Sequence, residues 1–173
     1  MRVICLVGAL LVGCGGTPPA PPPPVDLPPP APEVKPAEPA KVDLAAMSEA
    51  DRKAWLLKKG EEVYNSGGSG GIACVTCHQA TGEGLPPSFP PLKGQKDFMG
   101  DCVHHAGLIV HGLQGEITIN GTKFNGTMPA QPTLSDEEIA AAISYERSSW
   151  GNDFGPCMPE DVAKARSGPA PTP

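Results

Sequence analysis

Aromatic side chains are scarce in this 173-residue chain, at 5% of the residues, and basic residues are outnumbered by acidic ones. The first scarcity leaves a folded domain short of the large side chains that usually dominate a core. The chain has 13 Lys and Arg against 19 Asp and Glu, a net charge of −6. This acidic balance argues against a nucleic-acid partner. The apolar run at residues 3–13 is also shorter than the roughly 20 residues that a membrane-spanning helix needs.

That apolar run follows a lone Arg2 and is typical of the core of a secretory signal peptide. It ends in Leu11-Val12-Gly13-Cys14, which resembles a bacterial lipobox. The resemblance implies cleavage after residue 13 and lipidation of Cys14, which would hold the protein on the periplasmic face of a bacterial membrane. An ordinary signal peptide followed by an incidental cysteine is the alternative.

Prolines crowd the next segment, residues 15–42. Such a segment favours extended polyproline II at about 3.1 Å per residue, a reach on the order of 85 Å. We therefore predict a signal peptide at 1–13, a lipidated cysteine and flexible Pro-rich tether at 14–42, a folded domain at 43–166 and a disordered tail at 167–173. A Pro-rich ligand for a recognition domain is the alternative for the tether.

The run Cys74-Val75-Thr76-Cys77-His78 is a C-x-x-C-H motif, the attachment pattern of a c-type haem. On a helical turn, residues three and four apart share a face, so Cys74 lies beside both Cys77 and His78. The two thiols can then bond to the two vinyl groups of one porphyrin, and His78 can supply the proximal iron ligand. The motif predicts one covalently bound haem c.

Three other interpretations of the motif exist: a zinc site, a redox dithiol and a structural disulfide. A zinc site needs four ligands, usually in two spaced pairs, and the remaining group of Cys102, His104 and His105 lacks that spacing. A thioredoxin-like dithiol needs a βαβ context, whereas residues 66–71 before the motif are only serine and glycine.

A six-coordinate haem iron needs a second axial ligand, commonly methionine. Met128 lies downstream of the motif in Gly126-Thr127-Met128-Pro129, a segment predicted to have an irregular backbone. Met99 and Met158 are less supported, and a core role for Met128 is the alternative. The histidines at 104, 105 and 111 are rival ligands, although a surface or packing role is usual for such residues.

With these motifs, residues 55–166 resemble the class I monohaem cytochromes c, especially bacterial periplasmic members with a G-x-M-P loop. The resemblance implies a mostly α fold of three to five helices around one covalent haem, with a short β-hairpin before the methionine loop. It also implies that His78 donates its second ring N–H to the Pro90 carbonyl, and that Leu92 packs on the porphyrin. Pro91 in place of Pro90, or a plain Pro-rich surface loop, is the alternative.

The apolar spacing and capping residues predict the elements of this domain. Gly60 resembles the family's first-helix glycine, which lets the last main helix cross closely near Tyr145. Asn120-Gly121 suits the tight turn of a hairpin. We predict helices at 51–64, 101–113, 135–150 (with Ser135 as N-cap and Glu138 completing a capping box) and 159–166, and a hairpin at 116–124.

Four of the six cysteines already have a role: one in the signal peptide, one as the lipid site and two in the haem motif. Cys102 and Cys157 remain as an even pair. In an exported, oxidising compartment this pair favours a disulfide, which would contribute roughly 4 kcal/mol in the loop-entropy description. Two buried free thiols are the alternative.

Together these features predict a membrane-tethered, periplasmic c-type cytochrome that carries single electrons between respiratory proteins and is not itself an enzyme. By resemblance, the partners are of the quinol:cytochrome c reductase, terminal oxidase or nitrite reductase type. The alternatives are a haem subunit or module of an oxidase or reductase complex, and a haem-based sensor in which a gas displaces Met128. Haem would supply much of the core, so we expect the haem-free form to fold poorly.

Overall fold

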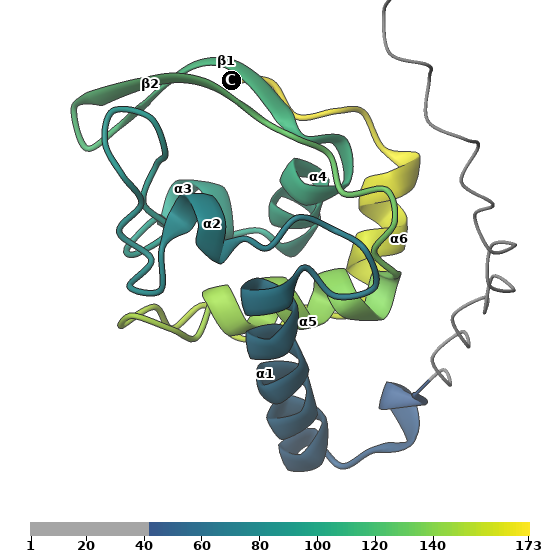
Figure 1. The fold of residues 1–173 in the computed structure, drawn as a ribbon. Coiled ribbons are helices and arrows are strands. Elements are labelled where there is room, and N and C mark those ends of the chain that lie inside the picture. Colours follow the sequence, from purple (N-terminus) through teal and green to yellow (C-terminus); the bar gives the residue numbers. More distant parts are fainter. Residues whose placement is uncertain (1–41) are drawn as a thin grey trace, which may run out of the picture. The chain divides into compact units, whose positions relative to one another are not determined.

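The computed structural model describes residues 42–173 (Figure 1), which form one compact unit. The predicted signal peptide, Cys14 and the tether up to residue 41 lie outside the described residues. In chain order the elements are η1 (Leu44–Ala46), α1 (Glu49–Ser66), α2 (Val75–His78), α3 (Lys96–Met99), α4 (Cys102–His111), β1 (Leu113–Ile119), β2 (Thr122–Met128), α5 (Asp136–Glu146) and α6 (Pro159–Ser167).

The expected fold class, mostly α with one short hairpin, is confirmed. The described residues contain six α-helices, more than the three to five predicted, because α2 and α3 are separate single turns of four residues each. No helix among residues 42–173 combines the length and apolar character needed to span a bilayer.

Helix α1 is longer at both ends than the predicted 51–64. The Ser48 hydroxyl accepts a hydrogen bond from the Asp51 backbone N–H at 3.2 Å, so the cap precedes Glu49. At the other end Gly67 adopts φ +82° and donates its N–H to the Val63 carbonyl. A left-handed residue of this kind ends a helix, and glycine adopts it without steric cost.

Helix α5 begins as predicted but ends earlier. Ser135 and Glu138 form the capping box that fixes its start. Its last carbonyls are taken by side chains: Ser149 Oγ donates to the Tyr145 oxygen at 2.7 Å, and Asn152 Nδ2 to the Glu146 oxygen at 2.8 Å. The same two carbonyls also accept from the backbone N–H groups of Ser148 and Ser149, so the chain tightens into turns and α5 ends at Glu146 rather than near residue 150.

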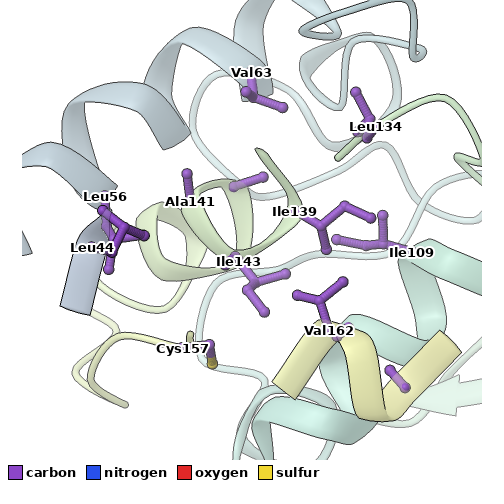
Figure 2. Packing of buried hydrophobic residues seen from close by; sticks show 14 residues of the cluster. Leu44, Leu56, Val63, Ile109, Leu134, Ile139, Ala141, Ile143, Cys157 and Val162 are labelled. Atoms are coloured by element: carbon purple, nitrogen blue, oxygen red, sulfur yellow. The ribbon is translucent and has the colours of Figure 1, made fainter. Parts of the chain in front are cut away.

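The core is built around α5, which is buried on nearly every side (Figure 2). Its short alanine side chains allow neighbouring helices to approach closely. Gly60 of α1 meets α5 here, since a Cβ placed on it would overlap the Ala141 carbonyl and lie 2.7 Å from Tyr145 Cβ. The buried cluster comprises Leu44, Leu56, Val63, Ala106, Ile109, Leu134, Ile139, Ala140, Ala141, Ala142, Ile143, Cys157, Val162 and Ala165.

The hairpin extends further than predicted and corrects one expectation. Strands β1 and β2 pair antiparallel from Ile119 and Thr122 out to Leu113 and Met128. Met128 is therefore the last residue of a strand, not part of an irregular loop. In this register Gly126 pairs with Gly115, which adopts φ +121°, a backbone conformation that glycine reaches without steric cost. Gly112, at φ +74°, separates β1 from α4 and ends the helix two residues before the predicted limit of 113.

A disulfide joins Cys102 at the start of α4 to Cys157 in the loop before α6, with Cα atoms 5.6 Å apart. Helix α6 ends at Ser167, one residue beyond the predicted domain limit, and the Ser167 hydroxyl donates to carbonyls of its last turn. The segment predicted as a disordered tail then runs extended. Its prolines at 171 and 173 lie close to Gly107 and Gly115, which leave room for them.

Candidate haem-binding site

The C-x-x-C-H motif forms the single turn α2. Cys74 precedes it, and the Cys74 carbonyl accepts hydrogen bonds from the backbone N–H groups of Cys77 and His78 at 3.2 and 2.9 Å. Both thiols are free and partly buried. The turn thus brings the three chemically active side chains of the motif to one place, as their spacing predicts.

The His78 imidazole is 8% exposed and is held by one hydrogen bond. Its Nδ1 lies 3.0 Å from the Pro90 carbonyl oxygen. Because that oxygen can only accept, Nδ1 carries the proton, and the unprotonated Nε2 is left to bind a metal ion. Pro90, rather than Pro91, is the partner.

The chain on both sides of α2 is held by distant side chains. The Gln131 side-chain oxygen accepts from the Ile72 N–H at 2.8 Å, and Glu138 accepts from Ser69. After His78, Tyr64 OH donates to the Gln79 carbonyl at 2.7 Å and Trp150 Nε1 to the Ala80 carbonyl at 2.9 Å. The glycine-rich run at 66–71 is therefore a fixed entry to the motif.

A cavity opens beside α2, between the hairpin and α5. Cys74, Cys77, His78, Leu92 and Met128 all line it. Most of the other lining residues are apolar: Ile72, Ala73, Phe89, Pro90, Pro91, Phe98, Met99, Leu108, Ile109, Leu113, Ile117, Ile119, Phe124, Pro129, Leu134 and Ala142. An apolar cavity with two free thiols and one oriented imidazole on its wall fits a covalently attached porphyrin.

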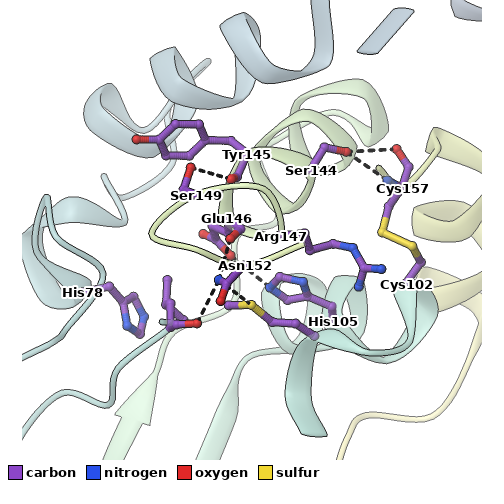
Figure 3. A network of polar contacts seen from close by, with 12 residues as sticks. His78, Cys102, His105, Ser144, Tyr145, Glu146, Arg147, Ser149, Asn152 and Cys157 are labelled. Atoms are coloured by element: carbon purple, nitrogen blue, oxygen red, sulfur yellow. Dashed lines mark hydrogen bonds and ion pairs between the residues drawn. A yellow bond between two sulfur atoms is a disulfide. The ribbon is translucent and has the colours of Figure 1, made fainter. Parts of the chain in front are cut away.

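Three further residues line this cavity: Met99 and His105, which the sequence offered only as alternative iron ligands, and Glu146, which it did not single out. Met99 is 1% exposed, and its sulfur receives a hydrogen bond from Asn152 Nδ2 at 3.6 Å (Figure 3). His105 and Glu146 form a buried pair, with His105 Nε2 2.9 Å from Glu146 Oε2. Helical spacing puts His105 on the buried face of α4, but no sequence motif marks it.

The geometry bears on the other interpretations of the motif. Cys102 is bonded to Cys157 in the disulfide, and the His104 ring stacks on Phe98 with 6.3 Å between ring centroids. Neither residue therefore completes a zinc site with Cys74 and Cys77. Among residues 42–173 no cluster of three His, Cys, Asp or Glu side chains could hold a metal ion. The sheet in this region is a two-stranded hairpin, not the βαβ unit of a thioredoxin-like dithiol.

Burial and one negative charge set the electrostatics of the cavity. Burial raises the pKa of the Cys74 thiol to about 12, and the Glu146 carboxylate contributes to that rise. The pKa of Tyr64 is also raised, by burial first and by Glu146 second. The field of Glu146 therefore reaches the attachment side of the cavity.

The chain belongs to the cytochrome c family, whose pattern matches residues 57–150. It is 36% identical over 124 residues to a cytochrome c-552 of Thermus thermophilus, covering 66% of this chain and 84% of the relative. It is 31% identical over 119 residues to the cytochrome c subunit of a quinone alcohol dehydrogenase from Gluconobacter oxydans, covering 63% of this chain but only 25% of that relative.

Membership of this family establishes the cofactor and the general role. The cofactor is covalently bound haem c with its iron, and the chain is an electron carrier. The cavity has the lining that such a group requires, since it is apolar and carries the free thiols of the family's attachment motif.

Proposed function

We propose that this protein is a membrane-tethered, periplasmic cytochrome c in which thioethers at Cys74 and Cys77 hold the haem and His78 and Met128 are its axial ligands. The observation that carries the ligand assignment is the His78 imidazole, whose Nδ1 is bound to the Pro90 carbonyl while Nε2 remains for iron. Two methionines line the same cavity, Met99 and Met128. The Met99 sulfur accepts a hydrogen bond from Asn152, so Met128, at the end of β2, is the methionine we assign to the iron. Leu92 and Pro90 complete the proximal side.

With two protein ligands on the iron, the haem supplies reversible one-electron chemistry and has no open coordination position for a substrate. The protein then has three tasks: to orient His78, to keep water away from the ring and to leave one edge accessible. Ile72, two residues before Cys74, is 51% exposed and also lines the cavity. An exposed apolar side chain beside the attachment cysteines fits a small apolar docking face for redox partners.

The partners we propose are membrane or periplasmic redox proteins of the quinol:cytochrome c reductase, terminal oxidase or nitrite reductase type. The similarity to the cytochrome c subunit of a quinone alcohol dehydrogenase supports a second candidate, a haem subunit of a dehydrogenase complex. Anchoring at Cys14 and a tether up to residue 42 suit either role, because they keep the domain near membrane partners while it moves between them.

The ligand assignment is tested by the weak near-infrared absorption band of methionine bound to ferric haem. Met128→Ala should abolish this band, and replacing Met128 by His should lower the reduction potential because a thioether favours ferrous iron. Met99→Ala is the matched control, since Met99 lines the same cavity. Loss of the band in Met99→Ala, with persistence in Met128→Ala, would move the ligand to Met99.

The tether is tested separately on intact membranes. Cys14→Ser should release a soluble protein with an unchanged haem spectrum. Deletions within 15–42 should leave the spectrum unchanged but slow oxygen consumption once the tether no longer spans donor and acceptor, because effective concentration then falls towards zero. A flat response down to a few residues would contradict a spanning role, and co-purification of the intact protein with a dehydrogenase would favour the second candidate.

A further inference from the structure

His105 and Glu146 form a buried pair (Figure 3). Both residues line the haem cavity. His105 comes from the middle of α4 and Glu146 is the last residue of α5. Each side chain is 4% exposed, and 2.9 Å separates Nε2 from Oε2. Such a pair is costly to bury, and apolar residues of similar volume are often at least as stable. A role beyond packing would explain its position in a mostly apolar wall.

The second ring nitrogen of His105 has no partner in the protein. Among the residues that the structure describes, His105 Nδ1 and Arg147 Nη1 are the buried side-chain nitrogen or oxygen atoms without a hydrogen bond. Arg147 does not line the cavity, and its other guanidinium nitrogens donate to the carbonyls of Gly155 and Phe154. Leaving a buried polar nitrogen unpaired costs about 1–3 kcal/mol. A group that enters the cavity and accepts from His105 would remove this cost.

The position of His105 is fixed from both ends of the pair. Cys102, one turn before His105 on α4, is joined by its disulfide to Cys157. The Cys157 backbone in turn exchanges two hydrogen bonds with the hydroxyl of Ser144, two residues before Glu146, at 2.9 and 3.2 Å. The disulfide and this serine therefore clamp α4 to α5 beside the pair and fix the position of the imidazole.

Haem offers few atoms that could satisfy this nitrogen. The porphyrin edge is apolar apart from two propionate carboxylates, and these only accept hydrogen bonds when ionised. We propose that His105 is an imidazolium in the holoprotein, with Nδ1–H donating a hydrogen bond to a haem propionate and Nε2–H donating to Glu146, so that the cationic ring bridges two carboxylates. This inference rests on haem c occupying the cavity. It makes His105 a cofactor-binding residue and Glu146 a positioning residue.

The bridge has a consequence for the reduction potential. A propionate charge stabilises ferric iron, which carries one more positive charge than ferrous iron. A donor at the propionate offsets part of that charge and so raises the potential, as hydrogen bonding around a haem commonly does. Removal of the His105 donor should therefore lower the potential, whereas removal of the Glu146 carboxylate should raise it.

The first test uses the wild-type holoprotein in the diamagnetic ferrous state. Nuclear Overhauser contacts between the carbon-bound ring proton next to Nδ1 of His105 and the propionate methylene protons are expected, together with nitrogen shifts that show Nδ1 to be protonated. Absence of the contacts, or an unprotonated Nδ1, would overturn the proposal. The test needs no variant to fold.

The second test compares the reduction potentials of variants that all carry Glu146→Gln. In this background, removal of the His105 imidazole leaves no buried carboxylate without a partner. Adding His105→Leu should shift the potential downward, whereas adding His104→Leu should not, because His104 is on the same helix but does not line the cavity. An unchanged or higher potential with His105→Leu, or an equal fall with His104→Leu, would overturn the proposal. All variants should keep the near-infrared methionine band. If the wild-type protein lacks the methionine band, the axial ligands proposed above are wrong, whereas the proposed hydrogen bond from His105 to a propionate is unaffected.

Discussion

The disulfide between Cys102 and Cys157 should carry a large share of the stability of the domain. The two residues are 55 apart, so the bond closes a loop that contains nearly all of α4, the hairpin and α5. In the loop-entropy description a crosslink of this span removes roughly 14 cal/mol/K from the unfolded chain, or about 4 kcal/mol at 25 °C. A typical domain is stable by only about 5–15 kcal/mol.

We therefore expect Cys102→Ala with Cys157→Ala to lower the free energy of unfolding of the ferric holoprotein by about 4 kcal/mol. Guanidinium unfolding, followed by far-UV circular dichroism and by haem absorbance, measures this change. Each single variant should lose nearly as much as the double variant, because either change removes the whole crosslink. A double variant that loses less than about 1 kcal/mol would refute the entropic reasoning, and additive single losses would point to side-chain packing instead.

Three smaller changes test the contacts that position the motif. Gly60→Ala should destabilise the domain in thermal unfolding, because overpacking against the Ala141 carbonyl costs about 1–3 kcal/mol and outweighs the helix-propensity gain of at most about 1 kcal/mol. Tyr64→Phe should cost about 1 kcal/mol in guanidinium unfolding, because the Gln79 carbonyl loses its phenol donor. Burial alone would raise the pKa of Glu138, but hydrogen bonds from Ser69 and Ser135 outweigh burial and lower this pKa. The Glu138 carboxylate therefore stabilises the fold at pH values above its unfolded pKa of about 4.3. That stabilisation is lost as the pH falls through the lower pKa of the folded protein. Glu138→Gln should flatten that acid limb of the stability curve.

Each of these expectations has a clear contrary outcome. A Gly60→Ala protein as stable as wild type would mean that α1 and α5 can separate at their crossing. A neutral Tyr64→Phe would mean that water replaces the phenol, and an acid limb unchanged by Glu138→Gln would assign the acid transition to other carboxylates.

Local sequence determined the parts of this protein that depend on neighbours in the chain. Helical spacing puts Cys74, Cys77 and His78 on one turn, and their C-x-x-C-H pattern predicts haem attachment. Ser48 and Ser135 mark the starts of α1 and α5, because a capping hydroxyl binds an N–H three residues away. Asn120-Gly121 likewise locates the turn of the hairpin, although pairing of the two strands beyond it carries β2 on to Met128.

Packing between distant segments decided the rest. Met99 lines the cavity from α3, and its sulfur accepts a hydrogen bond from Asn152 in the turn after α5. His105 meets Glu146 only because α4 lies against α5, and no periodicity in either helix specifies which buried polar residue faces which. A spacing rule acts within one helix or turn, whereas such partnerships depend on how helices far apart in the chain pack together, and that arrangement exists only in the folded domain.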